Sequence, residues 1–380
     1  GGTGGASGSG GTGGTGGTGG ASGSGGTGGS AGTGGKGGSG GMSGGGGSAG
    51  SAGTGGSAGT TATLIPQPAA DPRLTKACKY STDTMPSVSS IAARATNDYP
   101  VYGIYAWHWE VDYQPFQKNF ASMGMPTIRL AGPLFDKDSA TKEYVGDIAF
   151  KNLVSLGMEV MYTCESAKRD TFSSDDEFLA AYLNKLDSVL NRYGPKGEFW
   201  TANPQISYRP LLNIELWNEP NFGYMYSGGT AAQRQALYAL VLSKSYAHIK
   251  AKWPTVRVVG FGAGGASAAD KGFISNVLKA KTTPATADSF DVLSTHPYVD
   301  PCPPESYSVQ SWGSYSIAQS VNDIRKMLPN ANTPIWYTEG GWQISKAEGG
   351  AYDISGDKTV SRLFQAAYIT RMYAWATRLG

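Results

Sequence analysis

The chain has 380 residues, a formal net charge of +2 and 39% hydrophobic residues, enough to build one large globular domain. Its lysines and arginines are scattered rather than gathered in a basic stripe, which argues against nucleic-acid binding. No apolar run reaches the roughly 18 residues that a transmembrane helix requires. The three cysteines allow either one bridge with a free thiol or three free thiols. No metal-ligand spacing and no cofactor motif is found, so neither a metal nor a cofactor is expected.

The first hundred residues contain little that could form a core. Residues 1–60 are almost entirely Gly, Ser, Thr and Ala. Such a segment has no side chains whose burial could offset the entropy cost of ordering the backbone, so it predicts a disordered linker. Random-coil scaling gives a span on the order of 40–45 Å. Residues 61–100 contain five prolines and predict an extended transition segment.

From residue 101 onward, strand-like and helix-like runs alternate, which is typical of a parallel sheet with crossover helices. Strands are expected at 101–107, 127–130, 158–162, 211–217, 257–261, 290–295 and 335–338. The helices that follow them are expected within 115–123, 140–156, 175–193, 231–253, 273–281, 316–328 and 359–378. This order predicts an α/β fold, a (β/α)8 barrel whose catalytic domain covers residues 101–380.

The expected barrel has one β/α unit fewer than the eight of a complete (β/α)8 barrel. The chain stops at Gly380, directly after the helix of the seventh unit. The domain is therefore expected to lack strand eight, as if truncated. Either further residues complete the barrel, or a segment around residues 78–100 fills the gap.

Two of the expected strands end in a glutamate beside aromatic residues. Glu219 follows Leu216-Trp217-Asn218, and Glu339 follows Ile335-Trp336-Tyr337-Thr338. Retaining hydrolysis of a glycosidic bond uses two carboxyl groups about 5 Å apart, one as acid and one as nucleophile. A barrel brings the carboxyl ends of all its strands to one face. The two glutamates therefore predict a catalytic pair.

These motifs resemble glycoside hydrolase clan A, the retaining (β/α)8 glycosidases, and most closely family 39 and its bacterial relatives. The resemblance implies that Glu219, after strand four, is the acid/base and that Glu339, after strand seven, is the nucleophile. His296 and Tyr298 match the clan's positions beside the nucleophile, and Arg129 matches its strand-two arginine. The clan's strand-eight tryptophan, a platform for the sugar, has no counterpart in this chain.

Seven further residues are candidates for substrate binding: Asn218, His296, Tyr298, Arg129, Trp342, His108 and Trp109. Asn218 could hydrogen-bond the sugar 2-hydroxyl or only cap a turn. His296 and Tyr298 could be packed core residues, and Arg129 could lie on the surface. The tryptophans could stack on sugar faces or fill the barrel end. Glu215, two residues before Trp217, is expected to point away from it and is not counted as catalytic.

The predicted function is a retaining β-glycosidase that cleaves extracellular poly- or oligosaccharides by double displacement. The alternative is a surface-tethered carbohydrate-binding module derived from such a barrel, which the expected loss of strand eight favours. The sugar and the choice between endo and exo cleavage stay open. A linker of this kind resembles the spacers of bacterial lipoproteins, although their lipid-modified cysteine is absent here. An extracellular, surface-anchored location is therefore expected.

Overall fold

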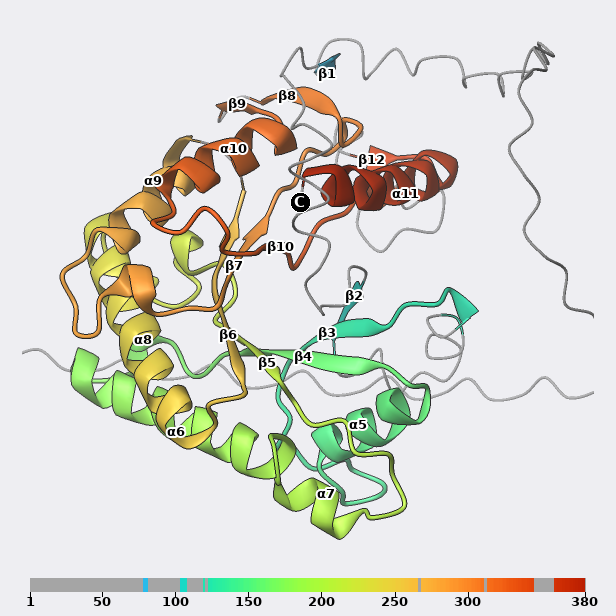
Figure 1. Cartoon of the computed structure of the whole chain (residues 1–380), viewed down its shortest axis with the longest axis vertical. Helices are drawn as coiled ribbons and strands as arrows, with labels where there is room; N and C mark the ends of the chain where they lie inside the picture. Colours follow the sequence, from blue (N-terminus) through green and yellow to red (C-terminus); the bar gives the residue numbers. More distant parts are fainter. Residues whose placement is uncertain are drawn as a thin grey trace, which may run out of the picture. The chain divides into compact units, whose positions relative to one another are not determined.

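The computed structural model describes residues 78–80, 103–107, 119, 122–265, 268–310, 313–344 and 359–379. The predicted linker, most of the transition segment, most of the predicted helix 115–123, His108 and Trp109 lie outside these residues. In the part described, the dominant element is a curled parallel sheet of seven strands (Figure 1). They are β2 (Gly103–Trp107), β3 (Thr127–Ala131), β4 (Glu159–Cys164), β5 (Asn213–Leu216), β6 (Arg257–Gly264), β7 (Val292–His296) and β10 (Ile335–Tyr337).

The strands lie side by side in chain order from β2 to β10, and every neighbouring pair is parallel. Helices run between or after them: α5 (Val145–Ser155), α6 (Asp175–Tyr193), α7 (Glu198–Ala202), α8 (Ala231–Lys252), α9 (Ala268–Leu278), α10 (Ile317–Met327) and α11 (Arg362–Leu379). Sequential parallel strands with crossover helices define the (β/α)8 class. The fold prediction is confirmed, with seven of the eight strands present among the described residues.

Helix starts follow from local chemistry that the sequence contains. Ser174 caps α6 by accepting a hydrogen bond from the Glu177 backbone, and Ser316 caps α10 in the same way. Thr230 and Gln233 form a capping box at the start of α8. These side chains bind backbone N–H groups that a helix leaves unpaired at its first turn. The predicted helix 175–193 has the same bounds in the structure.

Other elements differ from the prediction. Helix α9 begins at Ala268 rather than near residue 273, so Gly272 lies inside the helix instead of before it. Two short strands were not predicted, β8 (Ser306–Gln310) and β9 (Gly313–Tyr315), and they form an antiparallel sheet with β1 (Cys78–Tyr80). Residues 78–80 therefore pair with β8 and do not join the large sheet. A further small pair, β11 (Gln343–Ile344) and β12 (Thr359–Val360), is parallel.

The main hydrophobic core lies between the large sheet and its helices. Leu130 of β3 and Ile214 of β5 are fully buried in it, together with Phe150 of α5. The ring of Phe150 stacks on that of Tyr193 with centroids 4.3 Å apart. A second, smaller cluster joins the segments around β10, α10 and α11. Among the described helices, none combines the length and the apolar character needed to cross a bilayer.

Cysteine pairing, which the sequence left open, is one bridge and one free thiol. Cys78 of β1 is bonded to Cys302, which precedes β8. Cys164, at the end of β4, is free and fully buried in the main core. Burial raises the pKa of its thiol to about 12, so the thiolate does not form near neutral pH.

The bridge makes a prediction about thiol chemistry and stability. In denaturant, a thiol reagent should modify one cysteine per chain before reduction and three after it. Because the bridge joins residues 224 positions apart, reduction should lower the free energy of unfolding by about 2–4 kcal/mol. Modification of three cysteines in the unreduced, denatured chain would contradict this pairing.

Candidate active site

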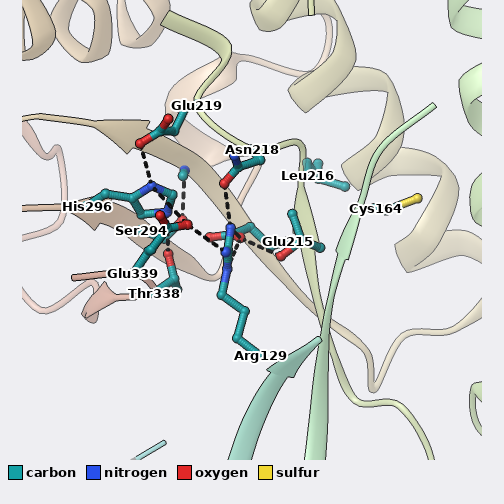
Figure 2. A network of polar contacts seen from close by, with 12 residues as sticks. Arg129, Cys164, Glu215, Leu216, Asn218, Glu219, Ser294, His296, Thr338 and Glu339 are labelled. Atoms are coloured by element: carbon teal, nitrogen blue, oxygen red, sulfur yellow. Dashed lines mark hydrogen bonds and ion pairs between the residues drawn. The ribbon is translucent and has the colours of Figure 1, made fainter. Parts of the chain in front are cut away.

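The predicted site residues from four strands meet at the carboxyl end of the large sheet (Figure 2). Arg129 comes from β3, Glu219 follows β5, His296 ends β7, and Glu339 follows β10. They are separated by up to 210 positions in the chain, yet they are linked by direct polar contacts. The structure thus brings these residues together at one end of the sheet, where the strand-end rule for barrels places them.

The backbone at the end of β5 is unusual. Trp217 has φ 72° and Glu219 has φ 45°, both in the left-handed region that residues with a side chain seldom adopt. The Glu219 N–H donates to the Gly262 carbonyl at 2.9 Å, which ties this turn to β6. The two left-handed residues end the alternation of side chains along the strand, and Trp217 packs against Phe178 of α6. Such backbone strain concentrates at functional sites.

Arg129 is the centre of the polar network. Its Nε donates to Glu215 Oε2 at 2.8 Å, its Nη2 to Asn218 Oδ1 at 2.8 Å, and its Nη1 to Glu339 Oε2 at 3.1 Å. The side chain is 4% exposed, so the guanidinium is buried and paired rather than on the surface. The planar fork of an arginine holds several acceptors in fixed directions. One cation thereby places two carboxylates and an amide.

Glu215 belongs to this network although the sequence analysis set it aside. Its side chain points to Arg129, whereas Trp217 packs against Phe178 of α6. The left-handed Trp217 breaks the alternation that would otherwise place residues two apart on one face of the strand. The carboxylate is fully buried and also accepts from Thr163 Oγ1 at 2.9 Å. Burial raises the pKa of Glu215, but Arg129, His296 and hydrogen bonds from Thr338 and Ser294 together leave the pKa lowered. Glu215 is thus the buried counter-charge that orients Arg129.

The carboxyl oxygens of Glu219 and Glu339 and a ring nitrogen of His296 all lie within 4.8 Å of one another. His296 Nδ1 is 3.1 Å from Glu219 Oε1, and its Nε2 is 3.1 Å from Thr338 Oγ1. His296 therefore spans from one glutamate to the residue before the other. A separation of about 5 Å between the two carboxyl groups is the spacing of retaining glycosidases.

Glu339 is held at both of its oxygens. Arg129 contacts Oε2, and the Tyr298 hydroxyl donates to Oε1. Burial raises the pKa of Tyr298 well above its usual value, as does the neighbouring Glu339 carboxylate, so the phenol remains a donor. Two donors on opposite oxygens orient this carboxylate, which is 19% exposed.

A metal ion is an alternative occupant for the three groups Glu219, His296 and Glu339, which offer one ligand atom each. His296 already contacts Thr338 with its other nitrogen, and Glu339 is already held by Arg129. A buried guanidinium at 3.1 Å from a would-be ligand oxygen disfavours a second cation by charge repulsion. The arrangement suits acid–base and nucleophilic chemistry better.

One predicted residue does not lie as expected. Trp342 was predicted to form a wall for the sugar, but it is 3% exposed and packs against Tyr368 in the second core cluster. Its Nε1 donates to the Cys302 carbonyl at 2.8 Å, so both the ring and its polar atom are used inside the protein. Trp342 is a core residue. His108 and Trp109 lie outside the described residues.

Glu165, directly after β4, is a carboxyl group that the sequence analysis missed. It is half-buried near the site. Burial raises its pKa to about 7, to which the Glu215, Glu339 and Glu219 carboxylates add while Arg129 opposes. Its position at a strand end was the signal available in the sequence, but no aromatic or glycine motif surrounds it.

Comparison with known proteins supports the (β/α)8 fold described above. No family model and no curated protein sequence matches the chain. Among solved structures, a chain from a study of two fungal β-1,4-galactanases matches with TM-score 0.50 and 16% identity, covering 74% of this chain and 87% of that chain. Others are a GH39 enzyme from Xanthomonas axonopodis pv. citri (TM-score 0.42, 16% identity, 65% of this chain) and a monomeric β-xylosidase from Caulobacter crescentus CB15 (TM-score 0.43, 17% identity, 65%).

This chain spans about half the length of those last two proteins, 53% in each case. At these identities the likeness concerns the fold. The galactanase match covers most of both chains and confirms a fold of the (β/α)8 type. The resemblance to clan A, drawn from the strand-end motifs, is therefore confirmed as a resemblance.

The raised pKa of Glu165 predicts a pH-dependent contribution to stability. The folded protein binds this proton more tightly than the unfolded chain, whose ordinary value is 4.5. Stability from this group is therefore complete below pH 4.5 and is lost as the pH rises through about 7. Urea unfolding should show about 1–3 kcal/mol less stability at pH 8 than at pH 4 from this source. Glu165→Gln should remove that difference.

The matched control is Glu198→Gln, because the Glu198 side chain is 75% exposed and lies on α7. This variant should keep the pH dependence of the unmodified protein. A Glu165→Gln variant with an unchanged pH dependence would contradict the assigned environment of Glu165.

Proposed function

We propose that the protein is a retaining β-glycosidase acting on oligo- or polysaccharides. The observation that carries the proposal is the pair of strand-end carboxyl groups, Glu219 and Glu339, whose oxygens approach within 4.8 Å. One is fixed by Arg129 and Tyr298, while the other contacts His296. Different surroundings for two neighbouring carboxyl groups are what separate roles of nucleophile and acid require.

In the first step, Glu339 attacks the anomeric carbon and forms a glycosyl ester. The bond from that carbon to the leaving oxygen breaks, and Glu219 gives its proton to this oxygen. Arg129 and Tyr298 hold the attacking carboxylate in one orientation, which lowers the entropy cost of reaching the near-attack geometry.

In the second step, a water molecule replaces the departed group. Glu219, now ionised, takes a proton from this water while the oxygen attacks the anomeric carbon, and the ester bond to Glu339 breaks. Both residues return to their initial protonation states. Two displacements at the same carbon retain the configuration.

Asn218 is positioned for a supporting role. Its Oδ1 accepts from Arg129 Nη2 at 2.8 Å, and this contact fixes the orientation of the amide. The Nδ2 group is then the donor left for substrate, and the sugar 2-hydroxyl is the proposed acceptor. Hydrogen bonds to that hydroxyl strengthen in the transition state of glycoside hydrolysis.

The extracellular, surface-anchored setting is part of the same proposal. A Gly-rich segment at residues 1–60 would hold residues 101–380 at a distance from a surface, where polymeric glycan is the substrate. The Cys78–Cys302 bridge supports an oxidising compartment. A binding module without catalysis is the weaker candidate, because both carboxyl groups and the residues that orient them are present.

Azide rescue tests the two roles separately. On an aryl glycoside with a poor leaving group, Glu219→Ala and Glu339→Ala should each lower turnover by about 10²–10⁴-fold or more. With a dinitrophenyl glycoside and azide, Glu219→Ala should yield the β-glycosyl azide, since azide attacks the glycosyl-enzyme in place of water. Glu339→Ala should yield the α-azide, because azide takes the nucleophile's place. Product configuration is read by NMR.

Glu198→Ala serves as the control, since this exposed carboxyl group lies on α7 away from the site, and it should retain full turnover without an azide product. The assignment is wrong if either site variant keeps its activity. A β-azide from Glu339→Ala together with an α-azide from Glu219→Ala would show that the roles are reversed.

A further inference from the structure

Two aromatic side chains next to Glu219 are exposed to solvent. Phe222 ends the short 3-10 helix η2 (Pro220–Phe222), and Tyr224 follows two residues later. They are 51% and 50% exposed, and their rings meet edge to face with centroids 6.4 Å apart. Single exposed aromatic residues are common on protein surfaces. A contacting pair beside a candidate catalytic group is less easily explained by chance and marks a binding surface.

The exposure is not the result of a loosely held loop. The Phe222 N–H donates to the Glu219 carbonyl at 3.1 Å. Asn221 Nδ2 donates to the Gly264 carbonyl at 2.8 Å, and the Gly264 N–H donates back to Asn221 Oδ1 at 3.0 Å. This two-way pair fixes η2 to the end of β6. Asn221 therefore positions the ring of Phe222, which follows it in the chain.

The other side of the loop is fixed as well. Asp170, in the segment after β4, accepts from the backbone N–H groups of Ser227 at 2.8 Å and Gly228 at 2.7 Å. Met225, next to Tyr224, is fully buried. Both exposed rings are thus presented by a backbone that is anchored before and after them.

The Phe222 ring lies directly beside the acid/base candidate. A Cβ placed on Gly264 would collide with Phe222 Cε2 and with Glu219 Oε1. The edge of the ring and the carboxyl oxygen therefore border the same glycine. Because Gly264 has no side chain, both groups can approach its backbone, and the aromatic ring lies next to the group that would protonate the leaving oxygen.

From this placement we infer that Phe222, with Tyr224 beside it, binds the leaving-group sugar of a β-linked oligo- or polysaccharide. The inference rests on the proposed function. Glu219 must contact the oxygen that links the departing sugar, so a surface beside Glu219 faces that sugar. Pyranose rings present C–H groups on their faces, which carry partial positive charge and pack on the negative face of an aromatic ring. The proposed substrate is thus a chain with at least one sugar on the leaving side.

The experiment compares two substrate types for each of four sugars: glucose, xylose, galactose and mannose. One type is the β-linked trisaccharide, and the other is the glycosyl fluoride with the anomeric configuration of that linkage, whose leaving group is a single atom. Phe222→Ala should lower the ratio of kcat/KM for trisaccharide over fluoride by roughly threefold to tenfold. Phe222→Trp should restore the ratio. Tyr208→Ala, which removes a 56% exposed aromatic residue before β5, should leave both substrates unaffected.

An unchanged ratio would overturn the inference. If both substrates lose kcat/KM equally, the ring only positions Glu219, and if neither loses it, the ring has no role in turnover. If the unmodified protein hydrolyses neither substrate type, the proposed function fails, and binding decides the inference. Binding is then measured as retarded migration in gels that contain β-glucan, xylan, galactan or mannan. Retardation that Phe222→Ala weakens and Tyr208→Ala leaves unchanged supports the sugar-binding role of Phe222. Absence of any Phe222-dependent binding overturns it.

Discussion

The site depends on one buried guanidinium. Arg129 contacts Glu215, Asn218 and Glu339 at once, so that β3 is linked to the end of β5 and to the segment after β10. A buried cation without compensating charge would be strongly destabilising, so the fully buried Glu215 is as necessary as the arginine itself. With Glu215 compensating its charge, Arg129 can fix the orientation of Glu339. The orientation of Glu339, the candidate nucleophile, thus depends on the buried ion pair between Arg129 and Glu215.

The backbone at the end of β5 provides the second constraint. Trp217 and Glu219 adopt left-handed conformations, which let consecutive residues serve separate regions. Trp217 packs beneath α6, Glu219 faces His296, and Phe222 emerges to solvent. The Asn221–Gly264 pair and the bond from Glu219 to Gly262 hold this turn against β6. A few strained residues therefore connect the core to the candidate catalytic pair and to the exposed aromatic pair of Phe222 and Tyr224.

The sequence predicted the parallel strands and the meeting of Arg129, Asn218, Glu219, His296, Tyr298 and Glu339, because strand-end residues share one face in a barrel. It could not predict that Trp342 is buried, since a tryptophan after a strand suits a core and a sugar site equally. Glu215 was passed over because the sequence shows neither the left-handed turn at Trp217 nor the buried Arg129 beside the glutamate. Glu165 and Phe222 lack a motif. The importance of Glu165 follows from charged groups distant in the chain, and that of Phe222 from an exposure that the sequence does not show. The Cys78–Cys302 pairing likewise needed the fold.

The most direct test of the account is identification of the residue that becomes covalently bound to sugar. A 2-deoxy-2-fluoro β-glycosyl fluoride slows both displacements but keeps a good leaving group, so the glycosyl-enzyme accumulates. Peptide mapping by mass spectrometry then locates the label. The account predicts a single labelled residue, Glu339, in the segment that begins with Ile335-Trp336-Tyr337. A label on Glu219 or Glu165 would contradict it.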